Sequence, residues 1–139
     1  MQNKFDQLAL IIANFTKIYA QFAQQKNLSY NELHFFYYLA QHKQATPKDI
    51  SQTWSIPKQT INSICTKFSK LGYLNIKTDD QDKRKKILSL TSTGKDFIQP
   101  VVNQISKAEI SVQEKFSIKQ FDKFLNDFEK LTTELNHLL

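Results

Sequence analysis

The chain has 139 residues, 40% of them apolar, and a formal net charge of +6, and its length suits one compact domain. A single cysteine excludes an internal disulfide, and two glycines leave no room for a glycine-rich phosphate loop. No secretion signal and no apolar run of membrane-spanning length can be recognised, so with its single cysteine we expect a cytoplasmic protein that is not bound to a membrane. With only two glycines and three prolines, the chain should be mostly helical.

The first predicted helix spans about residues 5–25. Its apolar residues recur at spacings of three and four, which places them on one side: Phe5, Leu8, Ile12, Phe15, Tyr19 and Phe22. Ile11 and Ile18 add a second apolar edge. A helix with two apolar sides needs two surfaces to pack against, so we expect one of them to belong to another copy of the chain.

The next two helices are marked by their first residues. Ser29 and Glu32 are spaced as a capping box, in which each side chain accepts a hydrogen bond from the other residue's backbone N–H. That helix should end near His42. Pro47 suits the first position of a third, short helix that ends near Trp54, because an N–H is not needed there.

A fourth helix, predicted over residues 57–71, separates two kinds of side chain. Its core-facing residues are Ile61, Ile64, Cys65 and Phe68, and its outer residues are Lys58, Gln59, Asn62, Ser63, Thr66, Lys67 and Lys70. The outer side chains are of the types that pair with base edges and phosphates. Any surface helix has a polar side, but this one has no acid between residues 57 and 77. Together with the short helix before it, the pattern predicts a helix-turn-helix.

A two-stranded hairpin is predicted next, with strands 73–77 and 83–90 around a tip at 78–82. Residues 57–95 contain nine Lys or Arg and three Asp, a net charge of +6 that equals the charge of the whole chain. Such a concentration of positive charge indicates a polyanion-binding surface, although a solvated charged hairpin is the alternative.

Arg84, the only arginine of the chain, lies two positions after Asp82. In a strand the two side chains would share a face, and Asp82 would hold the guanidinium by a bidentate bond. Arginine enters a narrow A·T-rich minor groove more readily than lysine, which favours a DNA contact at Arg84. A surface ion pair that contributes little is the alternative.

The C-terminal part is predicted to form two further helices, the first of which follows Thr91. Ser117 and Gln120 are spaced as another capping box. The last helix then repeats the spacing of three and four with Phe121, Phe124, Phe128, Leu131, Leu135 and Leu138. We expect the two terminal helices to form a two-fold dimer, the alternative being that they pack against each other within one chain.

Other chemistries find little support. The three histidines are far apart, no zinc-ligand spacing occurs, and no nucleophile–base pattern is present, so we expect no enzyme, no metal and no cofactor. Cys65, among apolar neighbours, is interpreted as an inert core thiol, with a redox switch as the alternative. Four aromatic residues belong either to the core or to an effector pocket: Tyr30, Tyr37, Tyr38 and Trp54.

Asp82-Lys83-Arg84, followed by Leu90-Thr91-Ser92-Thr93-Gly94, resembles the D-x-R…L-T-x-x-G motif of the MarR-type transcriptional regulators. The similarity extends to residues 47–50, to Thr60-Ile61 and to residues 71–74, and the overall layout agrees from end to end. The resemblance implies a mainly α (α+β) fold, with a winged helix-turn-helix in residues 29–91 and a helical dimerisation region in residues 1–28 and 92–139.

The resemblance also implies function. It implies a homodimer that binds double-stranded DNA at a pseudo-palindromic operator, as a repressor in the favoured interpretation, with Arg84 in the minor groove and Asp82 as its support. Such regulators often respond to a small-molecule effector, which the sequence does not name. A winged helix used as a protein–protein module is the alternative, and it leaves the basic helix and the lone arginine unexplained.

These patterns select two sets of residues. The expected DNA contacts are Lys58, Gln59, Thr60, Asn62, Ser63, Thr66, Lys67, Lys83, Arg84 and Lys85. The expected dimerisation residues are Phe5, Leu8, Ile12 and Phe15 with Phe121, Phe124, Phe128, Leu131, Leu135 and Leu138. Two positions depart from the family: Pro57 replaces the usual serine before the fourth helix, and Ser63 stands where many members have arginine, which leaves the base preference open.

Overall fold

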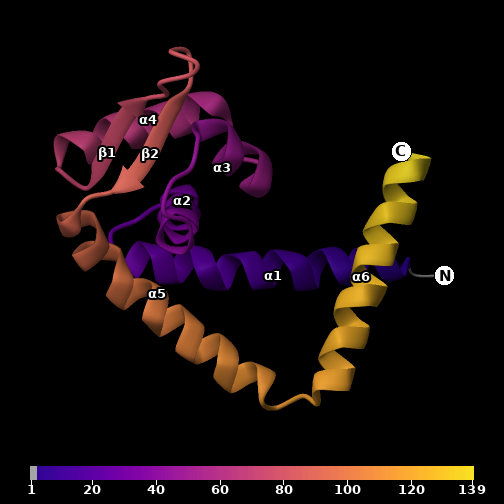
Figure 1. Ribbon diagram of the computed structural model, residues 1–139. Coiled ribbons are helices and arrows are strands. Elements are labelled where there is room, and N and C mark those ends of the chain that lie inside the picture. Colours follow the sequence, from indigo (N-terminus) through magenta and orange to yellow (C-terminus); the bar gives the residue numbers. More distant parts are fainter. Residues whose placement is uncertain (1–2) are drawn as a thin grey trace. The chain divides into compact units, whose positions relative to one another are not determined.

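The computed structural model describes residues 3–139 and shows six helices and a two-stranded sheet among them (Figure 1). The elements are α1 (Lys4–Gln25), α2 (Tyr30–Gln41), α3 (Pro47–Trp54), α4 (Lys58–Lys70), β1 (Leu74–Thr78), β2 (Lys86–Leu90), α5 (Ser92–Gln113) and α6 (Ile118–Leu138). The chain divides into two compact units, residues 1–102 and 103–139. A mainly helical chain with a small sheet confirms the predicted fold class, whereas the proposed division into DNA-binding and dimerisation regions stays a prediction.

The predicted helix starts are confirmed as hydrogen-bonded caps. At α2 the Ser29 hydroxyl accepts from the Glu32 N–H over 3.0 Å, and the Glu32 carboxylate accepts from the Ser29 N–H over 2.8 Å. The same reciprocal pair begins α3 at Thr46 and α6 at Ser117. At α4 the N-cap is Pro57, which supplies no side-chain hydrogen bond, as its sequence position predicts.

The turn between α3 and α4 is fixed by one buried side chain and two hydrogen bonds. Ser55 ends α3 in the left-handed conformation, with φ of 52°. The Ile56 N–H then donates to the Ser51 carbonyl over 3.1 Å, and the Ser51 hydroxyl donates to the Ile56 carbonyl over 2.6 Å. Ile56 itself is buried. Because the turn is held on both sides, α3 and α4 keep the fixed relation of a helix-turn-helix.

The hairpin is antiparallel, with Leu74 opposite Leu90 and Thr78 opposite Lys86. Its second strand begins at Lys86, so the prediction of a strand from residue 83 is wrong. The Lys85 N–H donates to the Asp82 carbonyl over 2.9 Å, which closes a turn around residues 83 and 84 and keeps both out of the strand ladder. Asp82 and Arg84 therefore do not share a strand face. The loop projects beyond the helices of the first unit (Figure 1).

A second contact of the sheet was not predicted. Ala45, in the connection between α2 and α3, forms an isolated antiparallel bridge with Leu88 of β2. The Ala45 N–H donates to the Leu88 carbonyl over 3.0 Å, and the Leu88 N–H donates back over 2.7 Å. This bridge ties the hairpin to the helix-turn-helix and joins the middle of β2 to the segment that precedes α3.

The Leu90-Thr91-x-x-Gly94 motif joins the hairpin to α5. The Thr91 hydroxyl donates to the Gly72 carbonyl over 2.6 Å and accepts from the Gly94 N–H over 3.0 Å. A Cβ on Gly94 would lie 2.1 Å from the Tyr73 carbonyl oxygen, so only glycine allows this close approach. The motif therefore has a packing role in this chain.

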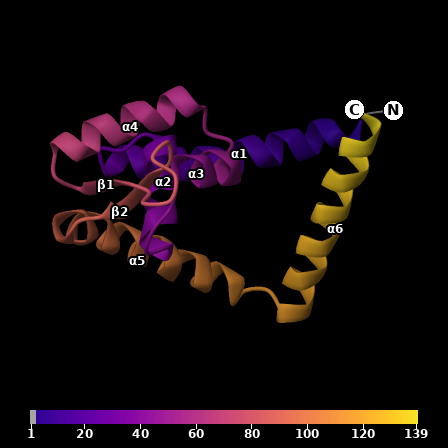
Figure 2. The same ribbon diagram turned by 45° about the horizontal axis from the view of Figure 1, so that its top comes forward.

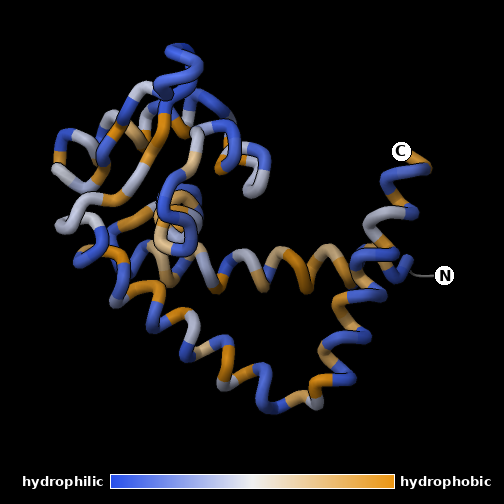
Figure 3. The backbone as a smooth tube through the Cα atoms, in the orientation of Figure 1, coloured by the Kyte–Doolittle hydropathy of each residue, from blue (hydrophilic) through white to orange (hydrophobic). Residues whose placement is uncertain are grey.

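The core of the first unit lies where α2, α3, α4, β2 and α5 meet, and its largest buried side chains include Phe35, Phe36, Ile50, Ile61, Leu88 and Ile98. The four predicted core residues of α4 are all buried: Ile61, Ile64, Cys65 and Phe68. By contrast, α1 buries only Ala23 and α6 buries no residue. Both of these helices carry hydrophobic residues at regular intervals along their length (Figure 3).

Candidate nucleic-acid interface

The outer side of α4 is exposed as the sequence predicts. Of the expected contact residues on this helix, Thr60 is half-buried and the others are exposed: Lys58, Gln59, Asn62, Ser63, Thr66 and Lys67. Figure 2 shows α4 running along one edge of the first unit, with no other element covering its outer side. The helix therefore presents a continuous row of polar side chains to solvent.

The polar groups in this row differ in what they can still bind. The Ser63 hydroxyl donates to the Gln59 carbonyl and the Thr66 hydroxyl donates to the Asn62 carbonyl, both over 3.0 Å. Their oxygens remain available as acceptors only. Within residues 3–139 the side-chain amides of Gln59 and Asn62 have no hydrogen-bond partner, so both can offer a donor and an acceptor to a base edge.

A concavity of about 570 Å³ lies between α3, α4 and the loop of the hairpin. Its lining includes five basic side chains and one acid: Lys48, Lys58, Arg84, Lys85 and Lys86 with Asp49. Asn62 and Gln52 also line it. The structure thus brings four of the predicted contact residues, from two separate elements, to one surface. Lys48, Gln52 and Lys86 were missed, although the spacing of four between Lys48 and Gln52 places both on one side of α3.

The single acid of the concavity is already bound within the protein. The Asp49 carboxylate accepts from the Thr46 backbone N–H over 3.0 Å. That backbone hydrogen bond is the main reason why the pKa of Asp49 lies below its usual value, and the charges of His42 and Lys48 lower the pKa further. Because this charge is committed to the cap of α3, the five cations dominate the surface.

Arg84 is held by a single carboxylate oxygen. Its Nε lies 3.3 Å from Asp82 Oδ1, and the same oxygen accepts from the Arg84 backbone N–H over 3.1 Å. The predicted bidentate bond is therefore wrong, because the turn commits this oxygen to the backbone as well. The Arg84 side chain is 93% exposed, so the rest of its guanidinium faces solvent. Lys83 is exposed in the same turn.

Lys67 differs from the other basic residues of α4. Its Nζ lies 2.8 Å from Glu32 Oε2 of α2, and this ion pair was not predicted. Lys67 also borders a shallow hollow of about 470 Å³ on the outer side of α4, with Asn62, Ser63, Thr66 and Lys70. Among the ion pairs of residues 3–139, it is thus the one expected contact on this helix whose charge is neutralised.

The expected dimerisation residues are only partly covered in the single chain. Those on α1 are exposed except for the half-buried Leu8, and Phe15 is 61% exposed. On α6, Phe124, Leu135 and Leu138 are exposed, while Phe121, Phe128 and Leu131 are half-buried. Further exposed apolar residues on α1 extend its surface: Leu10, Ile11 and Ile18.

The remaining candidate groups lie elsewhere. Cys65 is buried and its burial raises the pKa of the thiol, against a smaller opposing effect of Lys86. His34 contacts the rings of Tyr30 and Trp54 at centroid distances of 4.2 and 4.3 Å. Tyr37 and Tyr38 are half-buried.

Residues 3–139 contain no group of three or more His, Cys, Asp or Glu side chains arranged to hold a metal ion. In the same range, none of the helices combines the length and the apolar character needed to cross a membrane.

Comparison with solved structures identifies similar proteins. NMB1585, a MarR family regulator from Neisseria meningitidis, is 29% identical, with a TM-score of 0.87 over 98% of this chain and 96% of that chain. MepR of S. aureus, in a complex with DNA, is 17% identical, with a TM-score of 0.78 over 97% and 99% of the two chains. NadR, in complex with 4-hydroxyphenylacetate, is 14% identical, with a TM-score of 0.77 over 94% and 93%.

None of the curated proteins compared with the sequence matches it significantly. The sequence model of the MarR family matches residues 26–85, a range that contains all of the expected contact residues of α4 and the hairpin loop. Residues 26–85 therefore match the MarR family, and the chain has the winged-helix fold seen in a transcriptional regulator of that family.

Proposed function

We propose that the protein is a cytoplasmic, homodimeric transcriptional regulator. It binds a pseudo-palindromic operator in double-stranded DNA and acts as a repressor. The observation that carries the proposal is the concavity between α3, α4 and the hairpin loop, where five basic side chains surround the amide of Asn62. The negative phosphates of a DNA backbone would neutralise the positive side chains of this surface, and the edge of a base would offer hydrogen-bond partners to the amide.

The two elements suit different grooves. The outer side of α4, with the uncommitted amides of Gln59 and Asn62, fits the major groove, which admits a helix and presents a distinct pattern for each base pair. The exposed guanidinium of Arg84, at the end of a projecting loop, fits the minor groove. MepR, similar in fold, is found in a complex with DNA, which supports a DNA-binding role for this chain.

The exposed apolar sides of α1 and α6 support a homodimer. Phe15, Ile18 and Phe124 would each remain largely in water in a monomer, and exposed apolar patches of this kind mark protein–protein contacts. A two-fold dimer places two copies of α4 on two half-sites, which matches an inverted repeat. We propose repression because a dimer bound across a promoter would block the access of RNA polymerase.

A small-molecule effector is the remaining part of the proposal. NadR shares the fold and binds 4-hydroxyphenylacetate, which supports a similar sensitivity of this chain to a small molecule.

Selection of bound duplexes from a random pool, followed by footprinting, tests this function. We expect enrichment of an inverted repeat whose half-site centres lie about 10 bp apart, and protection of both half-sites together. Binding should weaken steeply as salt is raised. A pool that shows no enrichment would instead favour a winged helix that contacts another protein, and enrichment of single half-sites would contradict the dimer.

A further inference from the structure

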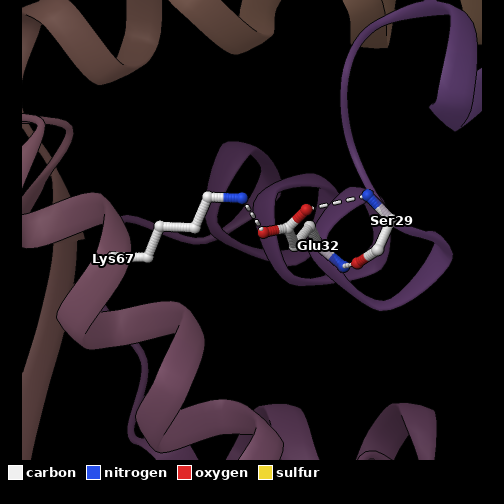
Figure 4. Close-up of polar contacts among 3 residues, drawn as sticks. All are labelled: Ser29, Glu32 and Lys67. Atoms are coloured by element: carbon white, nitrogen blue, oxygen red, sulfur yellow. Dashed lines mark hydrogen bonds and ion pairs between the residues drawn. The ribbon is translucent and has the colours of Figure 1, made fainter.

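Glu32 is the only charged or polar residue that is buried within residues 3–139. Its two carboxylate oxygens serve two helices: Oε1 accepts from the Ser29 N–H over 2.8 Å at the start of α2, and Oε2 accepts from Lys67 Nζ of α4 over 2.8 Å (Figure 4). One side chain therefore caps its own helix and binds the helix that is proposed to contact DNA.

The carboxylate is charged when it makes these contacts. Burial alone would raise the pKa of Glu32, but the hydrogen bonds from Lys67 and from the Ser29 backbone lower it by more, so the pKa lies below its usual value. A buried carboxylate that loses its cation is left uncompensated in a poorly solvated site, which is costly. The negative charge of Glu32 therefore favours a closed ion pair in the folded protein.

An apolar contact lies beside the ion pair. The rings of Phe36 on α2 and Phe68 on α4 meet edge to face, with centroids 4.6 Å apart. Phe36 lies one turn beyond Glu32, and Phe68 directly follows Lys67, whose Nζ lies 5.0 Å from the Phe68 ring centroid. These two adjacent contacts join α4 to α2, in addition to its packing on α3 and β1, and they oppose a rotation of α4 about its axis.

The roll of α4 decides which side chains face outward. Successive residues of a helix differ by about 100° in direction, so a small rotation moves Gln59 and Asn62 away from the bases that they would contact. Lys67 can hold this roll only while its ammonium stays on Glu32. Lys58, by contrast, lines the concavity and has no ion-pair partner within residues 3–139.

We propose that Glu32 is a positioning residue that holds Lys67 against α2, so that Lys67 sets the roll of α4 and does not neutralise a DNA phosphate. The proposal rests on the DNA-binding function proposed above. It assigns different roles to two lysines of α4: Lys67 orients the helix, and Lys58 contacts the backbone of DNA.

Salt titrations of four variants test this division on two duplexes, the operator selected by the protein itself and a scrambled sequence of the same composition. Lys58→Met, the control, removes one phosphate contact per subunit. Its log–log salt slope should be shallower by about 0.9 per subunit, with similar losses on both duplexes. Lys67→Met should keep the wild-type salt slope. Its affinity for the operator should fall on the order of tenfold, as it does when a base contact weakens, while its affinity for the scrambled duplex should change little.

Two conservative variants separate positioning from general damage to the fold. Lys67→Arg keeps a cation within reach of Glu32 and should restore operator binding to within about threefold of wild type, because a guanidinium also pairs with a carboxylate. Glu32→Gln keeps an acceptor for the Ser29 N–H but removes the charge that holds Lys67. It should lower the ratio of operator to scrambled binding and make the slope on the scrambled duplex steeper, because a free ammonium can then reach a phosphate.

Lys67→Met with a slope as shallow as that of Lys58→Met, and equal losses on both duplexes, would overturn the proposal. Urea unfolding of each variant shows whether it is folded, and if Lys67→Met does not fold, the slope of Glu32→Gln decides the matter: an unchanged slope overturns the proposal. Failure of the proposed function is visible separately, because the wild-type protein would then fail to prefer any operator over the scrambled duplex.

Discussion

The guanidinium of Arg84 reaches solvent from a turn, and within residues 3–139 its one ion pair is made by Nε, 3.3 Å from Asp82 Oδ1. The other two nitrogens are therefore free to bind a groove, and the position of the side chain depends on the turn more than on the ion pair. An exposed pair of this kind contributes little to stability. We propose that Asp82 instead aims the arginine, by holding its backbone N–H in the turn as well as its Nε.

Arg84→Lys should weaken operator binding by about 1 kcal/mol, the lower end of what an arginine in a groove contributes. The charge is kept, but an ammonium gives up its water less readily than a guanidinium. The loss should be larger on operators with A·T-rich flanks, where the minor groove is narrow, than on operators with G·C-rich flanks. Titration of both operator types against both proteins measures the difference.

Asp82→Ala should also weaken binding, although it removes a negative charge near DNA. The substitution deletes the oxygen that holds both the backbone N–H and the Nε of Arg84, so the arginine loses its aim. Simple electrostatics predicts tighter binding. A gain for Asp82→Ala, together with an equal effect of Arg84→Lys on both flanks, would mean that the loop is only a charged hairpin.

Gly94→Ala should destabilise the protein by about 2 kcal/mol or more, because the added methyl meets the Tyr73 carbonyl at 2.1 Å and the backbone must move. The clash should outweigh the helix propensity of alanine, which favours the substitution by about 1 kcal/mol. Urea unfolding measures the change. Gly72 is the matched control: it has φ of +78° and open space around it, so Gly72→Asn should be tolerated while Gly94→Asn should not.

At the scale of helices, α2 and α3 are joined by the ring of His34. It lies between the rings of Tyr30 and Trp54 and its Nδ1 is 2.8 Å from the Tyr30 carbonyl. Burial lowers the pKa of His34 below 6.5, and the hydrogen bond to the Tyr30 carbonyl opposes this only in part. The folded state therefore favours the neutral imidazole.

The free energy of unfolding should consequently fall as the pH drops below 6.5, by at most about 1.4 kcal/mol per pH unit for one proton. The sign follows because the unfolded chain binds the proton first. His34→Gln should remove this decline between pH 6.5 and 5, above the range in which Glu32 and Asp49 lose their charge. Urea unfolding at several pH values measures it, and an unchanged decline in the variant would show that another group is responsible.

Features that depend on neighbouring residues could be predicted from the sequence. The caps at Ser29, Thr46 and Ser117 and the two sides of α4 follow from spacings of three and four, which a helix converts directly into contacts. The start of β2 was mispredicted because the turn at Asp82 competes with the strand. The Ala45–Leu88 bridge and the Glu32–Lys67 pair were missed because their partners are distant in sequence and meet only in the packed unit.

At the scale of the whole molecule, the apolar sides of α1 and α6 call for a partner surface. Phe128→Asp combined with Leu135→Asp should raise the dissociation constant of the homodimer roughly a thousandfold or more, since each lost apolar side chain removes about 2 kcal/mol of burial. Sedimentation at micromolar concentration measures the change. Asn126→Asp with Thr133→Asp has the same spacing on the opposite side of α6 and should leave the dimer intact. A wild-type protein that sediments as a monomer would contradict the proposed assembly.

In a two-fold dimer, both copies of α4 make the same contacts, one copy in each half-site of the operator. Asn62 lines the concavity and its amide is uncommitted within the described chain, so its base partner should occur once in each half-site, at positions related by the two-fold axis.

The most direct measurement is a double-mutant cycle between Asn62→Ala and single base-pair substitutions across the selected operator. We expect Asn62→Ala to lose about 1–3 kcal/mol of binding on the intact operator. The variant should also be insensitive to substitution at one symmetry-related pair of positions, while every other position keeps its wild-type effect. If Asn62→Ala instead lowers binding to all operator variants by the same factor, or leaves binding unchanged, Asn62 does not read bases, which would contradict base recognition by α4.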